Sequence, residues 1–282
     1  MSASFSEYGT VLVTGANGML GQDLCPMLED SGYEVVETDI DNLDITNEIQ
    51  VRNVISDVNP DYVIHCAAYT NVDKAEEEKD KAELINGKGT ENIAKACNAN
   101  NSCLVYISTD YVFDGTKNSP YEPDDKTNPL GVYGITKFHG EQAVQKYCPK
   151  HYITRTSWLY GHHGKNFVET MISLAGKPEL KVVNDQIGCP TWTVDLSDAI
   201  ISLIDEEAPY GIYHTCGGGN TSWYGFAKEI FEKMNLDVNL LPCTTEEYPR
   251  PAKRPKYSIM NNHGLLRDWK LALKEYIELR ID

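Results

Sequence analysis

Residues 11–21 read Val-Leu-Val-Thr-Gly-Ala-Asn-Gly-Met-Leu-Gly, an apolar run followed at once by three glycines, each separated from the next by two residues. The pattern predicts a strand, a tight turn and a helix. Such a turn binds a dinucleotide when the pyrophosphate sits on the open amide end of the helix and the glycines let the backbone approach it. Gly15 would form the turn, Gly18 the close approach and Gly21 the contact between helix and strand. The alternative is a strand–loop–helix turn that binds nothing.

Asp39 ends the second apolar run, close to the offset of about 20 residues at which an acid meets the adenosine ribose of a bound dinucleotide. A carboxylate there accepts hydrogen bonds from the ribose hydroxyls and repels a 2′-phosphate, so Asp39 favours NADH over NADPH. Asp41 and Asp44 are close enough to take the same role. A solvated loop of acids is the alternative interpretation.

The whole chain alternates between strand and helix patterns, which is typical of a parallel sheet covered on both faces. We expect strands at residues 10–14, 34–38, 62–66, 103–108, 151–156 and near 211–216. We expect helices at residues 18–31, 48–58, 75–86 continuing into 89–99, and 132–147. The sequence therefore predicts a Rossmann-type, doubly wound α/β fold.

The predicted dinucleotide-binding domain covers residues 1–160 and is completed by roughly 193–216. Within the latter segment, residues 194–205 are amphipathic and precede a strand, so we expect them to return to the main sheet. Elsewhere beyond residue 160 the pattern loosens into short helices separated by glycines, prolines and aromatic residues. We expect a smaller C-terminal substrate-binding lobe, closed by an amphipathic helix within 261–282, at residues 161–192 and 217–282.

The composition limits the partners of the protein. Its 282 residues suit one large or two modest domains, and 42 acidic against 25 basic residues give a formal net charge of −17. No basic stripe offsets this charge, so we expect neither nucleic acid nor an anionic membrane as a partner. Residues 1–8 show no basic-then-apolar leader, and no apolar stretch approaches the ~20 residues of a membrane span. A cytoplasmic protein is expected.

The eight cysteines are scattered without a C-x-x-C pair, and several lie inside apolar runs. This distribution predicts reduced, buried thiols rather than a disulfide framework. His162 and His163 are adjacent in a glycine loop but lack further ligands at metal spacing. No metal site is predicted from them.

The fourth predicted strand runs into Ser108, Thr109 and Asp110, and the carboxyl ends of parallel strands border the ligand crevice. Tyr133 and Lys137 stand at i and i+4 of a predicted helix, so they share one face. An ammonium beside a phenol stabilises the ionised phenol, which would lower the pKa of Tyr133 from ~10 and suit it to general acid catalysis. The alternative is a Tyr–Lys pair on a surface helix. The nucleotide turn and the strand-end hydroxyls in the same chain favour the catalytic interpretation.

The glycine pattern, the Ser-Thr pair after the fourth strand and the Tyr-x-x-x-Lys spacing together resemble the extended short-chain dehydrogenase/reductase superfamily. Further stretches are similar to one family within it, the dTDP-4-dehydrorhamnose reductases. These stretches are residues 43–46, 65–76, 108–115, 155–161, 166–168 and 185–191. The similarity extends from Thr10 to about Pro255.

The resemblance implies reduction of the C4 ketone of dTDP-4-dehydro-6-deoxy-L-mannose to dTDP-L-rhamnose by NADH or NADPH. Tyr133 would protonate the carbonyl oxygen, Lys137 would hold the nicotinamide ribose, and Thr109 would bind the reacting oxygen. The implied cofactor-binding residues are Gly15, Asn17, Gly18, Met19, Leu20, Gly21, Asp39, Asp44, Ile45, Ala67, Ala68, Tyr69, Thr70, Tyr133 and Lys137. The implied substrate-binding residues are Thr109, Asp110, Trp158, Asn166 and Arg254.

Three of the substrate contacts have plainer alternatives. Trp158 could belong to the core, because large aromatic side chains are usually mostly buried. Asn166 could cap a helix. Arg254 has a planar fork that suits a diphosphate, but it could equally be a surface charge on a proline-rich loop.

The same scaffold includes nucleotide-sugar epimerases and a non-catalytic, NADP-binding regulatory subunit of methionine adenosyltransferase, so the fold alone leaves the reaction open. An epimerase would keep its cofactor bound and regenerate it in each cycle. A regulatory subunit would need no intact Thr109, Tyr133 and Lys137. The stretches around residues 110–113 and Trp158 resemble the reductases, and reduction is therefore the expected activity. Some members of the family form magnesium-binding dimers, which leaves a homodimer open.

Overall fold

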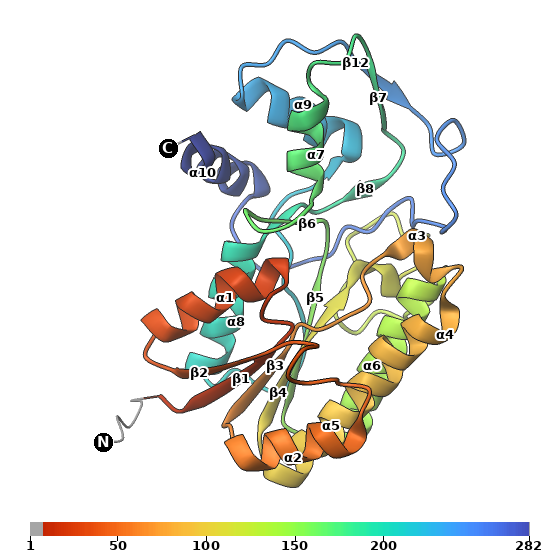
Figure 1. Cartoon of the computed structure of the whole chain (residues 1–282). Coiled ribbons are helices and arrows are strands. Elements are labelled where there is room, and N and C mark those ends of the chain that lie inside the picture. Colours follow the sequence, from red (N-terminus) through yellow and green to blue (C-terminus); the bar gives the residue numbers. More distant parts are fainter. Residues whose placement is uncertain (1–7, 282) are drawn as a thin grey trace.

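The computed structural model describes residues 8–281, so the predictions for residues 1–7 and 282 lie outside it. Its centre is a six-stranded parallel sheet in the order β10-β5-β4-β3-β1-β2 (Figure 1). The strands are β1 (Thr10–Thr14), β2 (Glu34–Thr38), β3 (Tyr62–His65), β4 (Cys103–Thr109), β5 (His151–Thr156) and β10 (Gly211–His214). The predicted strands and the doubly wound α/β fold are confirmed.

Helices cover both faces of the sheet, as its nearly continuous apolar strands require. One face carries α1 (Met19–Asp30) and α8 (Thr193–Asp205). The other face carries α2 (Glu48–Val58), α5 (Thr90–Asn100) and α6 (Val132–Tyr147). The stretch that we expected to return to the main sheet does so as α8.

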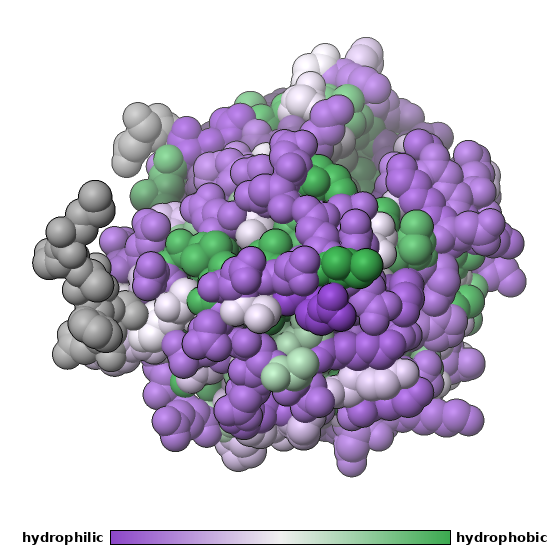
Figure 2. Space-filling view, turned by 60° about the horizontal axis from the view of Figure 1, so that its bottom comes forward, coloured by the Kyte–Doolittle hydropathy of each residue, from purple (hydrophilic) through white to green (hydrophobic). Residues whose placement is uncertain are grey.

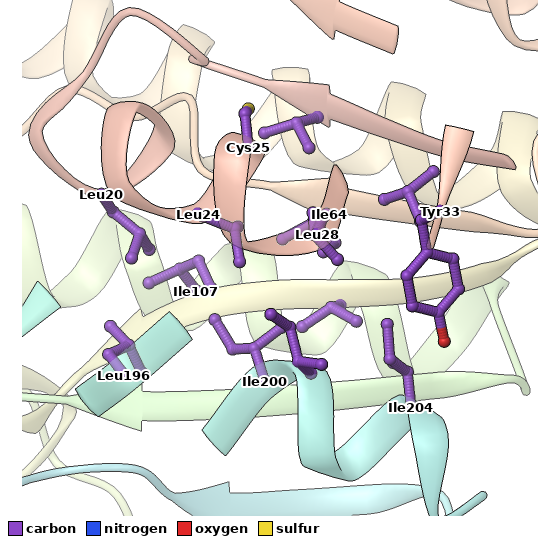
Figure 3. Close-up of a cluster of buried hydrophobic side chains, with 14 of the residues drawn as sticks. Leu20, Leu24, Cys25, Leu28, Tyr33, Ile64, Ile107, Leu196, Ile200 and Ile204 are labelled. Carbon is purple, nitrogen blue, oxygen red and sulfur yellow. The ribbon is translucent and has the colours of Figure 1, made fainter. Parts of the chain in front are cut away.

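The core on the first face lies between α1, α8 and the strands (Figure 3). Leu24 and Leu28 of α1 meet Leu196 and Ile200 of α8, and all four are fully buried. Ile64 of β3 contributes from the sheet. Full burial of each such side chain stabilises the fold by roughly 1.5–3 kcal/mol, so this layer fixes α1 and its glycine turn against the sheet.

The single helix predicted over residues 75–86 is wrong. The chain instead forms α3 (Val72–Ala75), α4 (Lys79–Ala82) and a π-helical turn at Glu83–Gly89, which leads into α5. Asn86, in the π-turn, accepts from the Tyr69 backbone N–H and donates from Nδ2 to the Tyr69 carbonyl and to Thr136 Oγ1. A buried amide that bridges a loop and α6 gives a physical reason for the wider turn, which helical periodicity does not reveal.

The chain beyond β5 builds a further hydrophobic cluster from α7 (Phe167–Leu174), α9 (Trp223–Lys233) and α10 (Trp269–Ile281), which lie together above the main sheet in Figure 1. The closing helix occupies the later part of its predicted range. Short strand pairs complete this region: β6 (Leu159–Tyr160) with β9 (Thr191–Trp192), β7 (Leu180–Val183) with β12 (Leu240–Cys243), and β8 (Ile187–Gly188) with β11 (Thr221–Ser222).

The face of the molecule seen in Figure 2 is mainly hydrophilic and carries only small apolar areas. Within residues 8–281, no helix is long and apolar enough to cross a membrane. All eight cysteines are free, and all but Cys66 are buried, which confirms the prediction of reduced, buried thiols.

Helix α6 approaches β4 closely because residue 140 is glycine. A Cβ at Gly140 would lie 2.2 Å from Tyr106 Oη and 2.8 Å from the carbonyl oxygen of Asn86. Tyr106 Oη donates a hydrogen bond to the carbonyl of Lys137, at 3.1 Å, in the space that the missing side chain leaves. The distance between α6 and the sheet is therefore set by this glycine.

We expect Gly140→Ala to lower the free energy of unfolding by roughly 1–3 kcal/mol, because overpacking outweighs the ~1 kcal/mol that alanine gains in helix propensity. Gly176→Ala is the control, since no heavy atom lies within 4 Å of its added Cβ. Urea unfolding followed by circular dichroism measures both variants. Equal stability of Gly140→Ala and the parent would contradict the proposed packing constraint.

Candidate active site

The glycine turn after β1 has the shape that a pyrophosphate needs. Gly15 has φ +70°, and a Cβ on it would lie 2.7 Å from the backbone nitrogen of Ala67. A Cβ on Gly21 would lie 2.5 Å from the carbonyl oxygen of Ala16. Gly18 is the N-cap of α1 and offers no side-chain cap, which leaves the first-turn amides open to an anion. Because β1 lies between β2 and β3, this turn stands where the strand order reverses, the usual ligand position in such sheets.

A cavity of about 680 Å³ opens at this turn, within the size range of small-molecule sites. It brings together residues from the ends of β1, β2, β3, β4 and β5 and from the first turns of α6. The predicted site residues that line it are Gly15, Gly18, Met19, Leu20, Gly21, Asp39, Asp44, Ile45, Ala67, Ala68, Thr70, Thr109, Asp110, Tyr133, Lys137 and Trp158. The predicted cofactor and catalytic residues thus share one space.

Two predicted cofactor residues do not line this cavity. Asn17 acts through its backbone, whose N–H donates to Asp39 Oδ2 at 3.0 Å. The hydroxyl of Tyr69 donates to Glu78 at 2.9 Å, and its backbone is held by Asn86. Both residues support the walls of the cavity.

Two predicted substrate residues also lie outside the cavity lining. Asn166 is the N-cap of α7 and accepts from the backbone N–H of Glu169 at 3.0 Å, which confirms the capping alternative. Arg254 donates from both terminal nitrogens to the two carboxylate oxygens of Asp73, at 3.0 Å each. The guanidinium of Arg254, which could bind a diphosphate, is therefore already paired with the carboxylate of Asp73.

Asp39 is held in place at the end of β2 by backbone donors, one of them the N–H of Ile40 at 2.7 Å. Asp44 also accepts two hydrogen bonds, both on Oδ1, from the backbone and the hydroxyl of Thr46, at 2.9 and 2.7 Å. Asp41 does not line the cavity. Asp39 and Asp44 both line the cavity, and Asp39, which directly follows β2, remains the predicted ribose-binding residue.

Tyr133 lies in the first turn of α6, and Thr109 is the last residue of β4. Burial raises the pKa of Tyr133 to about 12, the nearby Thr109 hydroxyl acts in the opposite direction, and the charge of Asp110 adds to the rise. The predicted lowering of this pKa is therefore wrong, because the low-polarity surroundings dominate. A phenol with this pKa keeps its proton at neutral pH, which is the state that a general acid requires.

Lys137 lies one turn further along α6 and is almost fully buried. Burial lowers the pKa of its ammonium to about 7, while the charges of Glu141 and Cys66 act in the opposite direction. The Nζ atom lies 4.1 Å from the centre of the Tyr106 ring, within the range of a cation–π contact. Lys137 is thus divided between its charged and neutral forms near neutral pH.

A buried ion pair lies beneath these residues and ties α6 to the sheet. Glu141 accepts from Arg155 Nε at 2.9 Å and from Arg155 Nη2 at 2.8 Å, and Ser108 Oγ donates to it at 2.6 Å. Arg155 Nη1 donates to the carbonyl of Pro123 at 3.0 Å. Both charged side chains are almost completely buried, and their polar atoms are well paired.

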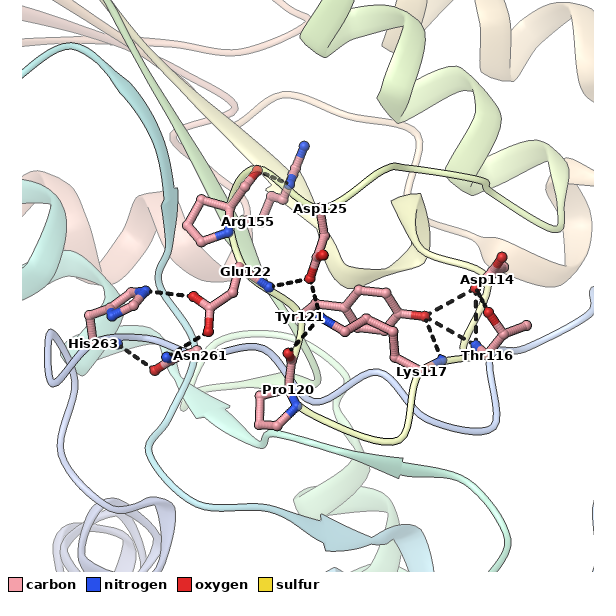
Figure 4. A network of polar contacts seen from close by, with 11 residues as sticks. Asp114, Thr116, Lys117, Pro120, Tyr121, Glu122, Asp125, Arg155, Asn261 and His263 are labelled. Atoms are coloured by element: carbon pink, nitrogen blue, oxygen red, sulfur yellow. Dashed lines mark hydrogen bonds and ion pairs between the residues drawn. The ribbon is translucent and has the colours of Figure 1, made fainter.

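The loop after β4 is anchored by a second polar network (Figure 4). Tyr121 Oη donates to Asp114 at 3.0 Å, and the Tyr121 carbonyl accepts from the backbone N–H of Asn261 at 2.9 Å. Glu122 accepts from Asn261 Nδ2 at 3.0 Å and lies 2.8 Å from a ring nitrogen of His263. These bonds connect the segment after Asp110–Val112 to the C-terminal part of the chain.

Trp158 lines the cavity in an unusual backbone conformation, with φ +48°. Its ring stacks on Trp223, with centres 3.6 Å apart and an interplanar angle of 9°. A Cβ on Gly188 would lie 2.6 Å from the Trp158 ring, and Trp223 Nε1 donates to Gln186 at 3.2 Å. Trp158 packs against the C-terminal hydrophobic cluster and also lines the cavity. The alternative that Trp158 is only a core residue therefore describes part of its surroundings.

In the part of the chain from residue 8 to 281, no three His, Cys, Asp or Glu side chains are grouped to hold a metal ion. The His162 ring stacks on Tyr276 with centres 4.2 Å apart. His163 Nε2 lies 3.4 Å from a carboxylate oxygen of Asp23. The two histidines thus have separate contacts.

A family model described as the RmlD substrate binding domain matches residues 9–280. The chain belongs to this family. A dTDP-4-dehydrorhamnose reductase from Streptomyces griseus is 44% identical to it, over 94% of this chain and 91% of that protein. The predicted membership of the dTDP-4-dehydrorhamnose reductase family is confirmed.

Two solved structures are similar over nearly their whole length. A dTDP-4-dehydrorhamnose reductase from Clostridium acetobutylicum is 48% identical, with a TM-score of 0.94, over 97% of this chain and 100% of that one. The reductase from Bacillus anthracis, solved in complex with NADP, is 44% identical, with a TM-score of 0.93, over 96% of this chain and 99% of that one.

The sequence interpretation gave no site role to several other residues that line the cavity, among them Ile40 and Lys165. Each directly adjoins a residue that the sequence does single out, Asp39 and Asn166 respectively. Proximity along the chain is the signal that could have identified them.

We expect Lys137→Met to stabilise the protein at pH 7 by roughly 1–4 kcal/mol, because it removes a buried ammonium. The pKa of Lys137 is lowered to about 7 from its ordinary 10.5, so between these values the unfolded chain binds more protons than the folded one. This group therefore makes the parent more stable as pH rises across that window, and the advantage of the variant should shrink.

Urea unfolding between about pH 7 and about pH 10 measures this difference. Lys146→Met, at an exposed position of the same helix, is the matched control and should show a constant difference from the parent. If the stability difference between Lys137→Met and the parent did not change with pH, the pKa of Lys137 would not be lowered in the folded protein.

Proposed function

We propose that this protein uses NADH or NADPH to reduce the C4 ketone of dTDP-4-dehydro-6-deoxy-L-mannose, giving dTDP-L-rhamnose. One observation carries the proposal: the glycine cradle and the set of Thr109, Tyr133 and Lys137 open onto the same cavity. Relatives named dTDP-4-dehydrorhamnose reductase, similar over almost the whole chain, support this choice of substrate.

The dinucleotide would lie with its pyrophosphate on the amides that Gly18 leaves open and its adenosine ribose against Asp39. When bound in reduced form, it supplies the hydride. Lys137, at the other end of the cavity, would hold the nicotinamide ribose. The residues present fit the cofactor. The turn is tight enough that only glycine can occupy positions 15 and 21 without colliding with the protein backbone, and Gly18 leaves the α1 amides open to the pyrophosphate.

Tyr133 would donate its proton to the C4 oxygen as negative charge develops there. Its pKa of about 12 keeps the proton on the phenol until the carbonyl becomes basic enough to take it. The hydroxyl of Thr109, which lines the same cavity as Tyr133, would form a hydrogen bond with the same oxygen. Lys137 in its charged form would stabilise the phenolate that remains, so its pKa of about 7 makes activity depend on pH near neutrality.

Residues 161–192 and 217–282 would form the substrate-binding lobe. Trp158 would offer an apolar ring to one face of the pyranose, since its other face is covered by Trp223. Asp110 would contact the polar groups of the sugar. Asn166 and Arg254 would support the site without contacting the substrate, Asn166 by capping α7 and Arg254 by fixing the loop around Asp73.

Tyr133→Phe should lower kcat about 10²- to 10⁴-fold and leave the Kd for NADPH within about twofold, because the lost contact forms with charge that develops in the transition state. Absorbance at the NADPH band, with a dTDP-4-keto-6-deoxyhexose as substrate, measures turnover, and identification of the sugar tests the reaction. Tyr147→Phe, at the far end of α6, is the control.

Equal losses of NADPH binding and turnover in Tyr133→Phe would assign the residue a structural role. Sugar interconversion without net consumption of NADPH would replace the reductase proposal with the epimerase. NADPH binding without any sugar chemistry would favour a regulatory subunit.

Asp39→Ala should shift the ratio of kcat/KM toward NADPH, since the carboxylate repels a 2′-phosphate. The loss of one repulsive charge should change the ratio about 10-fold. Steady-state kinetics with both cofactors measures it, and Asp41→Ala, outside the cavity, is the control. If the ratio stays that of the parent, another residue reads the ribose.

A further inference from the structure

The cavity has few positive charges for a protein that would bind two diphosphate-containing ligands. Among its lining residues within the described chain, only Lys137 and Lys165 carry a cationic side chain. Lys137 is buried at the catalytic end, on the ring of Tyr106. Lys165 is exposed and makes no hydrogen bond or ion pair with any residue from 8 to 281. It is therefore free to meet a ligand.

The loop that carries Lys165 is seated on the first turns of α1. A Cβ on Gly161 would lie 3.2 Å from Met19 Cγ and 3.2 Å from Asp23 Oδ2, and Asp23 also accepts a hydrogen bond from Thr193. At the other end of the loop, Asn166 Nδ2 donates to the Gly161 carbonyl at 2.7 Å. Lys165 is thus presented to the cavity from a loop fixed at both ends, next to the helix that carries the open amides.

The negative charge around the cavity makes the position of Lys165 significant. The protein has a formal net charge of −17, and Asp39, Asp44 and Asp110 all line the cavity, so the surroundings repel an anion. The first turn of α1 offers amides but no cationic side chain. Arg254, the other candidate for a diphosphate, is bound at both ends of its fork to Asp73. Among residues 8–281, Lys165 is therefore the one cation lining the cavity that is both exposed and unpaired.

We propose that Lys165 binds the pyrophosphate of a ligand in this cavity, which deepens and rests on the function proposed above. The dinucleotide is the source that the structure favours, because the Lys165 loop packs on α1. The diphosphate of the sugar nucleotide offers the same chemistry and is the second source. In either case the ammonium supplies the charge that the helix amides alone lack.

Direct binding to the full chain tests the proposal without relying on turnover. Calorimetry gives the Kd of Lys165→Gln for NADH, ADP, adenosine and dTDP. We expect a loss of about 5- to 20-fold for NADH and ADP, with adenosine within about twofold, because adenosine has no phosphate. Lys165→Arg should keep the affinity within about threefold. The salt dependence of the Kd for ADP should be weaker in Lys165→Gln than in the parent.

Lys177→Gln, at another exposed lysine three residues beyond the end of α7, is the matched control and should bind every probe as the parent does. A loss confined to dTDP would assign Lys165 to the sugar nucleotide and keep the proposed chemistry. Unchanged affinity for NADH, ADP and dTDP alike would overturn it. Because these probes need no reaction, a failure of the proposed reductase activity would appear separately, in the turnover assay.

Discussion

The arrangement of the site depends on the buried ion pair between Glu141 and Arg155. Two charges in a low-dielectric interior are costly unless every polar atom is paired, and here Ser108 and a backbone carbonyl complete the set. Removing either partner would leave an uncompensated charge, at a cost of about 3–5 kcal/mol. The pair fixes α6 against β4 and β5. Thr109 follows Ser108 directly, and Tyr133 and Lys137, the proposed catalytic residues, lie on α6. The ion pair therefore helps to fix the relative positions of these three side chains.

The same ion pair influences the charge of the site. Glu141 stands one turn after Lys137, and its carboxylate raises the pKa of the lysine against the larger effect of burial. Arg155 in turn shares that carboxylate, so the lysine is supported by a partly neutralised anion. The Tyr106 ring adds attraction without adding a charge. Burial, opposed by the shared carboxylate, brings the pKa of Lys137 to about 7.

The sequence was sufficient for features that depend on local pattern. The glycine turn, the strands and the i, i+4 spacing of Tyr133 and Lys137 follow from residue type and periodicity alone. The sequence was insufficient where a side chain pairs with a residue that is distant in the chain. Arg254 pairs with Asp73, which is 181 residues away in the chain, and no local signal distinguishes that pairing from a free diphosphate-binding arginine. The prediction of a lowered pKa for Tyr133 was wrong for a similar reason, because the spacing identifies Lys137 as a neighbour but does not reveal that Tyr133 is buried.

Trp158 shows how the second half of the cavity would recognise a sugar. A tryptophan in the left-handed region stores strain of order 1–3 kcal/mol, which persists only where the surroundings dictate it. Here the stack on Trp223 and the close contact at Gly188 do so. The ring is therefore rigid before any ligand arrives, and binding need not order it. An apolar plane accepts many pyranoses, so under the proposed function discrimination among them would fall to the polar groups near the end of β4, where the ketone would meet Thr109 and Tyr133.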